Sequence, residues 1–202
     1  MSKVFSAHAV SVDGYISGRD PSDGDGGFGR GLGDAAMLFD WYSDGDTPSR
    51  VFNGFHLSEP SARVFDALAA RVGAAVAGRA TYEHSSHFGG GSPHPTVPLF
   101  VLSHGPVPEI SERQTHVTTG IADVIAAARE AAGDKDVGLM GGGVLTSALE
   151  ADLVDEVILH QVPVVLGAGR PFFQALGEHV QLNLLEALPA PGVTHLHYEV
   201  VR

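Results

Sequence analysis

The chain has 202 residues, of which 44% are hydrophobic, and it contains 26 glycines, 12 prolines and no cysteine. This apolar content is enough for one domain with a sizeable core and argues against disorder. A formal net charge of -12 with only 12 lysines and arginines disfavours a nucleic-acid-binding surface. The absence of cysteine excludes disulfides, thiolate nucleophiles and zinc–thiolate sites.

The sequence also carries no membrane signal. No basic and then apolar leader precedes Val4, and no apolar run approaches the roughly 20 residues of a membrane span. We therefore expect a soluble, cytoplasmic protein with neither a membrane nor a nucleic-acid partner, folded as a single domain over residues 1–202.

The first predicted strand covers residues 3–12, where small and apolar side chains alternate. The segment 11–18, SVDGYISG, follows, and its Asp-Gly step indicates a kink or turn before apolar residues resume. His8 lies inside the strand, where a hydrogen-bonded core histidine is a more frequent role than a catalyst.

Residues 19–57 have no clear period and are expected to form a long loop insertion. Segments 24–29 and 31–36 match the glycine fingerprint of dinucleotide-binding proteins, but neither follows an apolar strand, so we reject both. One interpretation of this loop is a surface insertion that its aromatic residues hold against the body. The other is a lid whose Trp41 and Tyr42 line the pocket of a flat substrate, and we favour the lid.

Residues 60–72 predict an amphipathic helix, and 74–77 a short buried strand. The strand ends at Gly78, which puts Arg79 and Thr81 at the carboxyl edge of a sheet, where α/β proteins bind ligands. The alternative for Arg79 is an ordinary surface salt bridge, and this segment alone favours that alternative.

Three histidines, His84, His87 and His94, follow in a loop rich in glycine, proline and serine. Such a group suggests a metal site, but the spacing fits no standard zinc site and no helix is expected to order it. We therefore favour a solvated loop and expect no metal.

Residues 98–102 predict the next strand, which ends in Ser103 and His104. A short strand at 115–118 and an amphipathic helix at 121–132 come after it.

The segment 137–143, VGLMGGG, is an apolar strand that ends in three glycines, and helix-compatible residues 144–151 follow. Glycine lets a ligand approach the backbone closely, and a helix N-terminus adds a partial positive charge. The segment therefore predicts either a phosphate-binding turn or a tight turn with nothing bound.

Residues 157–166 predict another apolar strand, and 180–188 and 193–201 predict a closing antiparallel hairpin. The order of all these elements predicts a single three-layer α/β domain. Its sheet is expected to be mixed but mostly parallel, with the antiparallel hairpin at the C-terminal edge.

These motifs, in this order, resemble the dihydrofolate-reductase-like family, which includes the reductase domain of riboflavin biosynthesis. The resemblance covers nearly the whole chain. Its most specific parts are 11–16, SVDGYI; 78–83, GRATYE; and 141–143, GGG, followed by 153–156, LVDE.

The resemblance implies that NADPH lies across the strand ends. It implies that Gly78, Arg79 and Thr81 bind the pyrophosphate and the 2′-phosphate, and the guanidinium fork of arginine suits phosphate. The further cofactor-binding positions that it implies are Ala9 and Ile16 at the nicotinamide, Leu102, Ser103 and His104 around the adenine ribose, and Gly141, Gly142, Gly143, Val144 and Leu145 at the pyrophosphate. In the family, the first two glycines are joined by a cis peptide bond.

Two departures from the family's pattern concern the substrate. Dihydrofolate reductases have a carboxylate near the start of helix one, where this chain has Ala62, with Glu59 the nearest carboxylate. The riboflavin enzymes usually carry a glutamate just before the glycines, where this chain has Met140. Folate is therefore a doubtful substrate, and the pyrimidine of the riboflavin pathway is an alternative that is not favoured.

The resemblance implies an NADPH-dependent reductase that transfers hydride to a small heterocyclic or carbonyl substrate. The candidates for proton delivery are Asp13, a bound water and Glu59. The alternative is a non-catalytic nucleotide- or ligand-binding protein of the same fold, which the missing carboxylates favour. Family members commonly form homodimers, and the apolar strand 157–166 with Phe172 and Phe173 is compatible with a buried dimer contact.

Overall fold

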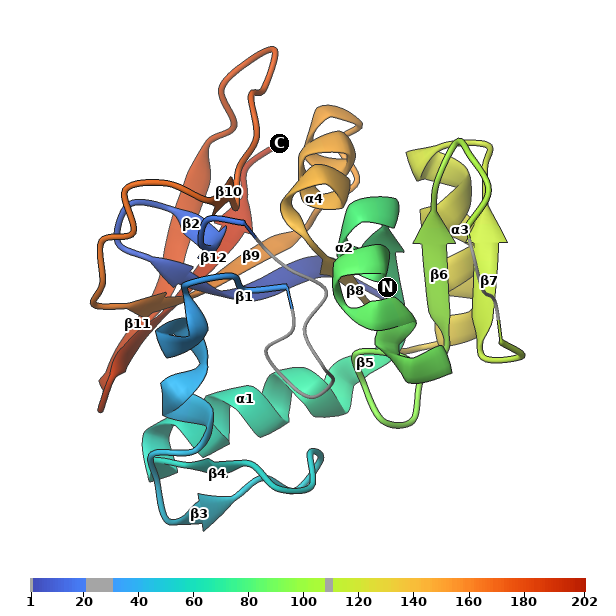
Figure 1. Ribbon diagram of the computed structural model, residues 1–202. Coiled ribbons are helices and arrows are strands. Elements are labelled where there is room, and N and C mark those ends of the chain that lie inside the picture. The colour runs from blue at the N-terminus through green and yellow to red at the C-terminus, as the bar shows by residue number, and fades with distance from the viewer. Residues whose placement is uncertain (1, 21–30, 108–110) are drawn as a thin grey trace.

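An eight-stranded sheet forms the centre of the computed structural model, which describes residues 2–20, 31–107 and 111–202. The strand order is β11-β12-β9-β1-β8-β5-β6-β7. All pairs from β9 through β1, β8, β5 and β6 to β7 are parallel, whereas β12 pairs antiparallel with β9 and with β11. The expected α/β fold, mostly parallel with an antiparallel C-terminal hairpin, is confirmed (Figure 1).

The strands of this sheet follow the apolar runs of the sequence. They are β1 (Val4–Ser11), β5 (Val72–Gly78), β6 (Leu99–Leu102), β7 (Gln114–Val117), β8 (Asp136–Met140), β9 (Glu156–Val162), β11 (Leu182–Ala190) and β12 (Val193–Val200). β9 ends four residues earlier than predicted, because Pro163 has no backbone N–H to donate to a neighbouring strand.

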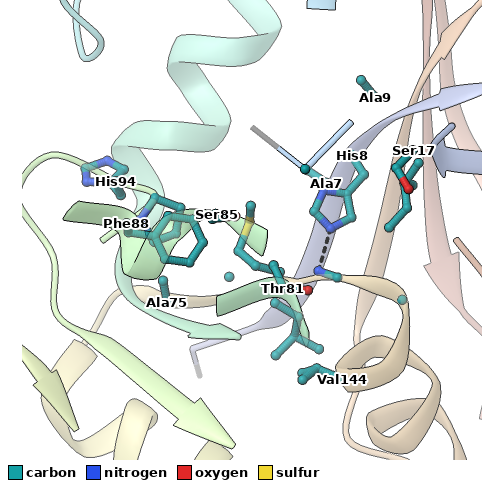
Figure 2. Close-up of a pocket in the computed structure, with 18 of the residues that line it drawn as sticks. Ala7, His8, Ala9, Ser17, Ala75, Thr81, Ser85, Phe88, His94 and Val144 are labelled. Carbon is teal, nitrogen blue, oxygen red and sulfur yellow. Dashed lines mark hydrogen bonds between the residues drawn. The ribbon is translucent and has the colours of Figure 1, made fainter. Parts of the chain in front are cut away.

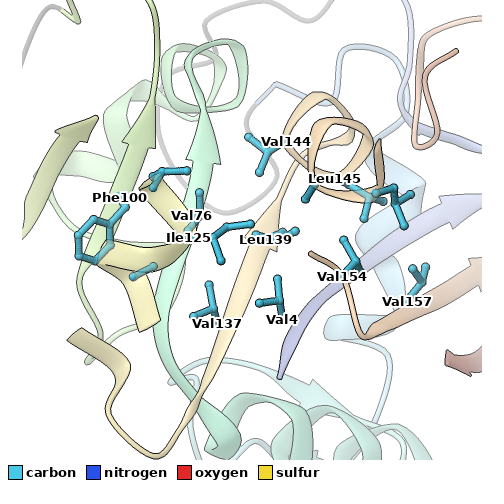
Figure 3. Packing of buried hydrophobic residues seen from close by; sticks show 14 of the residues in the cluster. Val4, Val76, Phe100, Ile125, Val137, Leu139, Val144, Leu145, Val154 and Val157 are labelled. Atoms are coloured by element: carbon cyan, nitrogen blue, oxygen red, sulfur yellow. The ribbon is translucent and has the colours of Figure 1, made fainter. Parts of the chain in front are cut away.

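Helices cover both faces of the sheet. Helices α3 (Ile121–Ala132) and α4 (Gly142–Glu150) pack against one face in a core that includes Val4, Val76 and Leu139 (Figure 3). Helix α1 (Glu59–Arg71) and the 3-10 helix η1 (Ala36–Tyr42) pack on the other face in a second cluster. This arrangement confirms the predicted three layers.

The described part of the 19–57 segment has its own secondary structure. Besides η1, it contains a two-stranded ribbon of β3 (Thr47–Pro48) and β4 (His56–Leu57), which contacts α1 and lies beyond it from the sheet (Figure 1). The sequence analysis did not predict these elements, because each is too short to show a periodic pattern of apolar residues. The glycine-rich stretch that matched the dinucleotide fingerprint at 24–29 lies outside the described residues.

Four other short elements complete the fold. They are β2 (Tyr15–Ser17), which pairs antiparallel with β10 (Arg170–Pro171), the helix α2 (Arg79–His84) and the 3-10 helix η2 (Ser86–Gly90). None of the described helices is both long and apolar enough to span a lipid bilayer.

The strand expected at a dimer contact lies in the interior of the sheet. β9 is hydrogen-bonded to β1 on one side and β12 on the other, and Val157 and Ile158 are at most 1% exposed. Phe172 is fully buried, and only Phe173 of that pair reaches the surface. Burial within the chain therefore accounts for the apolar side chains of Val157 and Ile158, and a homodimer stays a prediction.

Candidate functional site

A cavity of about 910 Å³ lies between the central strands β1, β5 and β8 and helix α1 (Figure 2). Its size is at the upper end of the roughly 300–1,000 Å³ that is usual for ligand sites. Of the residues expected to bind a cofactor, the cavity is lined by Ala9, Ile16, Gly78, Thr81, Gly141, Gly142, Gly143 and Val144. The tertiary structure thus gathers segments that are up to 135 positions apart in sequence, from Ala9 to Val144, around one space.

The glycine turn packs too closely against its neighbours to carry side chains. Gly141 has a φ of +98°, and a Cβ there would lie 2.1 Å from Oγ1 of Thr81. A Cβ on Gly142 would lie 2.6 Å from the carbonyl oxygen of Phe172. Both contacts explain why the sequence has glycine here. The peptide bond between the two glycines is trans, so the cis bond that the resemblance implied is not present.

Helix α4 directs its N-terminus at the cavity. The N–H groups of Gly142, Gly143 and Val144 belong to the first turn, where no carbonyl of the same helix can accept them. They can therefore donate to an anion, and the helix dipole adds to the attraction. Leu145 differs, since its N–H donates to the carbonyl of Gly141 at 3.2 Å and its side chain is fully buried. Leu145 thus belongs to the core and does not line the cavity.

His8 joins this turn to β1. Its Nε2 accepts the backbone N–H of Gly141 at 2.7 Å, so the ring proton lies on Nδ1. Burial lowers the pKa of His8 to about 4, which keeps the ring neutral. His8 is hydrogen-bonded, as a core histidine would be, but it also lines the cavity (Figure 2).

The residues expected near the 2′-phosphate lie beside the cavity and do not line it. The Nε of Arg79 donates to Glu83 at 2.7 Å, and a Cβ on Gly105 would lie 3.0 Å from one terminal nitrogen of Arg79. Ser103 is 4% exposed, and its Oγ donates to the carbonyl of Gly105 at 2.8 Å. Leu102 ends β6 and His104 is exposed. Arg79 therefore makes the alternative surface salt bridge and also reaches the loop that follows β6.

Aromatic rings form the other end of the cavity. Tyr42 lines it, together with Phe39, Phe52, Phe55 and Phe65. Trp41 stacks on Tyr42 with ring centroids 3.9 Å apart, but it is 2% exposed and faces the core. The expected lining role is therefore wrong for Trp41, because its large ring is used to pack η1 against the sheet.

Neither carboxylate considered for proton delivery lines the cavity. Asp13 accepts hydrogen bonds from Ser11 Oγ at 2.7 Å and from the N–H groups of Leu166 and Gly167. These hydrogen bonds, of which the one from Ser11 has the largest effect, lower the pKa of Asp13 to about 2. This carboxyl is therefore ionised near neutral pH. Glu59 is exposed on the first turn of α1. Asp13 thus fixes two loops and Glu59 faces solvent, so the structure brings neither carboxylate into the cavity.

The sequence of this α/β chain identifies its family. The sequence profile of the RibD C-terminal domain matches residues 2–196. The chain belongs to the RibD C-terminal domain family.

Relatives support this assignment. A putative riboflavin biosynthesis protein from Shewanella sp. PV-4 has a solved structure with 27% identity and a TM-score of 0.69, and the match covers 99% of each chain. Dihydrofolate reductase from Enterococcus faecalis, complexed with NADP(H), gives a TM-score of 0.58 at 14% identity over 99% of this chain and 97% of that one. The uncharacterized protein YwjB of Bacillus subtilis (strain 168) is 28% identical over 128 residues, 63% of this chain and 73% of its own length. The fold resemblance seen in the sequence is therefore confirmed.

In this RibD C-terminal domain, no Asp or Glu is present among the described residues that line the cavity. Its ionisable lining groups are Arg170, Tyr42 and four histidines: His8, His84, His94 and His160. Nδ1 of His84 is 2.5 Å from the carbonyl oxygen of Ala80, to which it donates, and its Nε2 accepts from Arg170 at 2.6 Å. Arg170 and His84 thus join β10 to α2 beside the cavity.

The histidines 84, 87 and 94 are more ordered than a solvated loop. His84 ends α2, His87 lies in η2, and His94 is 8% exposed, with its Nε2 3.1 Å from the carbonyl oxygen of Ala69. Burial lowers the pKa of His94. Across residues 2–20, 31–107 and 111–202, no cluster of three or more His, Cys, Asp or Glu could hold a metal ion. The prediction of a solvated loop is wrong for His94, which packs under α1.

The sequence prediction did not identify Arg170 or His160 as residues of the cavity. Arg170 follows a glycine-rich turn that gives no sign of its direction. His160 lies within an apolar strand. Alternation along the strand puts its side chain on the same face as that of Ile158, but this pattern does not show which face of the sheet holds a ligand.

Proposed function

We propose that the protein is an NADPH-dependent reductase that transfers a hydride to a small heterocyclic or carbonyl substrate. The observation that carries this proposal is the shape of the cavity. The N-terminus of α4 and its bare glycine turn lie at one end, and the aromatic rings of Phe39, Tyr42 and Phe65 lie at the other. One end suits the phosphates of a dinucleotide, and the other suits a flat ring.

The relatives agree with a reductase. Membership of the RibD C-terminal domain family supports a reductase-type function, and the Shewanella relative is described as a putative riboflavin biosynthesis protein. The dihydrofolate reductase from Enterococcus faecalis, which shares the fold, is complexed with NADP(H). These relatives support NADPH as the occupant of the cavity.

The residues present fit such a dinucleotide. The absence of a side chain at exposed Gly143 allows a pyrophosphate to approach the N–H groups in the first turn of α4. Arg79, on the exposed edge next to the 103–105 loop, would hold the 2′-phosphate through its guanidinium. The small side chain of Ala9 leaves room for the nicotinamide beside β1. When bound, the reduced nicotinamide supplies the hydride, and the protein holds it against the substrate.

The phosphate contact can be tested without changing the fold. Gly143 is exposed, and a Cβ there meets only Gln174 at an ordinary 3.5 Å, so Gly143→Asp is sterically allowed. An acid in the first turn of a helix stabilises that helix, yet here it repels a pyrophosphate. By calorimetry, wild type is expected to bind NADPH, and Gly143→Asp is expected to lose at least tenfold in affinity with no loss of thermal stability.

The matched control puts the same charge at a different helix. Ala122 is exposed in the first turn of α3, away from the cavity, so Ala122→Asp should bind NADPH as wild type does. Negligible binding heats with NADPH and NADH for the wild type would contradict the proposal. Equal loss in both variants would show that net charge, and not the α4 contact, governs binding.

Two other functions remain alternatives. The absence of acidic residues from the described lining favours a non-catalytic ligand-binding protein, which would bind NADPH but oxidise it with no member of a carbonyl and heterocycle panel. The family favours the pyrimidine reductase of riboflavin biosynthesis, although Met140 lines the cavity where a glutamate is usual. Reduction of the ribosylaminopyrimidine of that pathway, and of no other panel member, would select this function.

We also propose that the protein forms a homodimer through β11. This strand is an edge of the sheet, and Leu184 and Leu185 are 51% and 50% exposed on it. An apolar edge strand is an unstable surface in a monomer and is stabilised by pairing with a second copy.

A further inference from the structure

We propose that Ser58, Ser61, His195 and His160 form a proton relay that ends in the cavity, and that His160 donates the proton that accompanies hydride transfer. The inference rests on the proposed reductase function. Reduction of a C=O or C=N group needs a proton as well as a hydride, and no Asp or Glu lines the described part of the cavity. A histidine is then the natural donor.

The relay is a continuous series of hydrogen bonds. Nδ1 of His160 lies 2.8 Å from Nδ1 of His195, and Nε2 of His195 lies 3.0 Å from Oγ of Ser61. Oγ of Ser58 donates to Oγ of Ser61 at 3.0 Å. The two histidines and Ser61 are at most 3% exposed, whereas Ser58, at the N-terminus of α1, is partly exposed. The series therefore runs from the surface to the interior.

We assign the direction of donation from the surface end of the series, where Ser58 donates to Ser61. Ser61 accepts the hydroxyl hydrogen of Ser58, so its own hydrogen is free to point to Nε2 of His195. His195 then carries its proton on Nδ1 and donates it to Nδ1 of His160. As a result, the proton of His160 is on Nε2. In this assignment Ser61 and His195 each accept from the surface side and donate toward the cavity.

The backbone places His160 at the cavity wall. His160 on β9 is the register partner of Ala9 on β1 and of His195 on β12, so the three side chains share the face of the sheet that α1 covers. Both His160 and Ala9 line the cavity. Among the described residues, Nε2 of His160 has no hydrogen-bond partner, and this atom is not fully buried. It can thus donate to a ligand.

The surroundings keep the pair neutral and oriented. Trp41 packs against both rings, with centroids 5.1 Å from His160 and 5.3 Å from His195. Burial lowers the pKa of His195 to about 4 and holds the pKa of His160 well below its usual range, with further lowering from His195. An imidazolium is therefore not the donor near neutral pH. Neutral rings can still pass a proton by exchanging tautomers.

The step balances as follows. The substrate carbon accepts the hydride with its two electrons, and its oxygen or nitrogen takes the proton of His160 Nε2. His160 receives at Nδ1 the proton of His195, which in turn receives one at Nε2 from Ser61. Ser61 takes the proton of Ser58, and a hydronium ion of the solvent replaces that one and leaves as water. The nicotinamide leaves oxidised, and each relay group ends neutral with its proton on the other side.

The first test reads the tautomers directly and needs no substrate. Long-range ¹H–¹⁵N correlation spectra of the full chain are expected to show His160 protonated at Nε2 and His195 protonated at Nδ1. A His160 protonated at Nδ1 would overturn the relay. Ser61→Ala is expected to weaken the preference of His195 for the Nδ1 tautomer, while Ser61→Thr, which keeps the hydroxyl, should preserve it.

The second test follows NADPH oxidation with a panel of small aldehydes and cyclic imines. His160→Gln is expected to lower kcat by about 10²-fold or more, the usual contribution of a general acid, with the NADPH affinity unchanged by calorimetry. Ser61→Ala should lower kcat with little change in KM and should reduce the solvent deuterium isotope effect on kcat. Ser61→Thr should restore both.

The control is His197→Gln, because His197 lies on the same strand as His195 but contacts Glu156 at 3.1 Å and does not line the cavity. It should leave kcat within a few fold of wild type. Full activity of His160→Gln would overturn the relay while leaving the reductase intact. A wild type that binds no NADPH would instead contradict the proposed function, and the tautomer spectra would still decide the direction of the hydrogen bonds.

Discussion

The backbone N–H of Gly141 donates to Nε2 of His8 at 2.7 Å, and this bond ties the glycine turn to the first strand beside the cavity. The two residues are 133 positions apart in sequence. A side chain of β1 thereby fixes the turn from which α4 starts.

Replacing His8 by leucine should destabilise the protein. The N–H of Gly141 would lose its acceptor in a partly buried position, which costs about 1–3 kcal/mol. Urea denaturation should show this as a lower midpoint with an unchanged slope. His8→Gln, which keeps an acceptor, should recover part of the loss, and a stability of His8→Leu equal to wild type would show that the bond contributes nothing.

Replacing Gly141 by alanine should be more costly. The methyl group would meet Oγ1 of Thr81 at 2.1 Å, and the φ of +98° is unfavourable for any residue with a Cβ. We expect a loss of about 1–3 kcal/mol or more in the free energy of unfolding. Gly143→Ala is the matched control, because its Cβ meets only ordinary contacts at 3.5 Å, and it should be close to wild type.

Arg79→Ala should change the affinity for NADPH but not the affinity for NADH. Removing the guanidinium should weaken the binding of NADPH, which has a 2′-phosphate, by about tenfold or more, while the binding of NADH, which lacks this phosphate, should be unaffected. The ion pair of Arg79 with Glu83 is largely exposed, so its loss should leave thermal stability nearly unchanged. Calorimetric titration of both nucleotides checks this, and an equal loss for both would remove Arg79 from the 2′-phosphate site.

Acid should destabilise the protein through Glu156. Burial opposes ionisation of this carboxyl, but the close contact with His197 and the hydrogen bonds from Lys3 and Arg71 outweigh it and hold the pKa well below its usual range. Because the folded pKa lies below the unfolded one, the stabilisation is complete above the unfolded value of 4.5 and is lost as the pH falls below it.

Glu156→Gln is expected to lose about 1–3 kcal/mol near neutral pH, since Arg71 loses a charged partner but keeps its ion pair with Asp136. Its stability should also change less than that of wild type between pH 5 and about 3. Denaturant titrations at several pH values measure both effects. Parallel pH profiles for the two proteins would exclude Glu156 as the source of acid sensitivity.

The proposed dimer predicts a mass of twice 21.0 kDa by light scattering at micromolar concentration. Leu184→Lys should shift the protein to the monomer, because the charge would be buried at the β11 edge. Val165→Lys is the control, since Val165 is 70% exposed but lies on the loop after β9. A monomeric wild type would contradict the dimer.

The sequence by itself determined the order and type of the main elements. Helix α3 begins and ends where its pattern of apolar residues predicted, and the glycine run at 141–143 marked the start of α4. These features are local, because periodicity and glycine turns depend on residues close together in the chain. They were enough for the α/β fold and the family resemblance, and most of the cofactor-binding residues that the resemblance implied do line the cavity.

Only the tertiary structure decided which polar side chains face the cavity. Trp41 and Leu145 went to the core and Asp13 to a loop contact, since packing against distant segments sets the direction of a side chain. His160 and His195 are 35 positions apart and meet only because β12 pairs with β9 in one register. Such a pair depends on long-range strand order, which no local pattern of residues specifies.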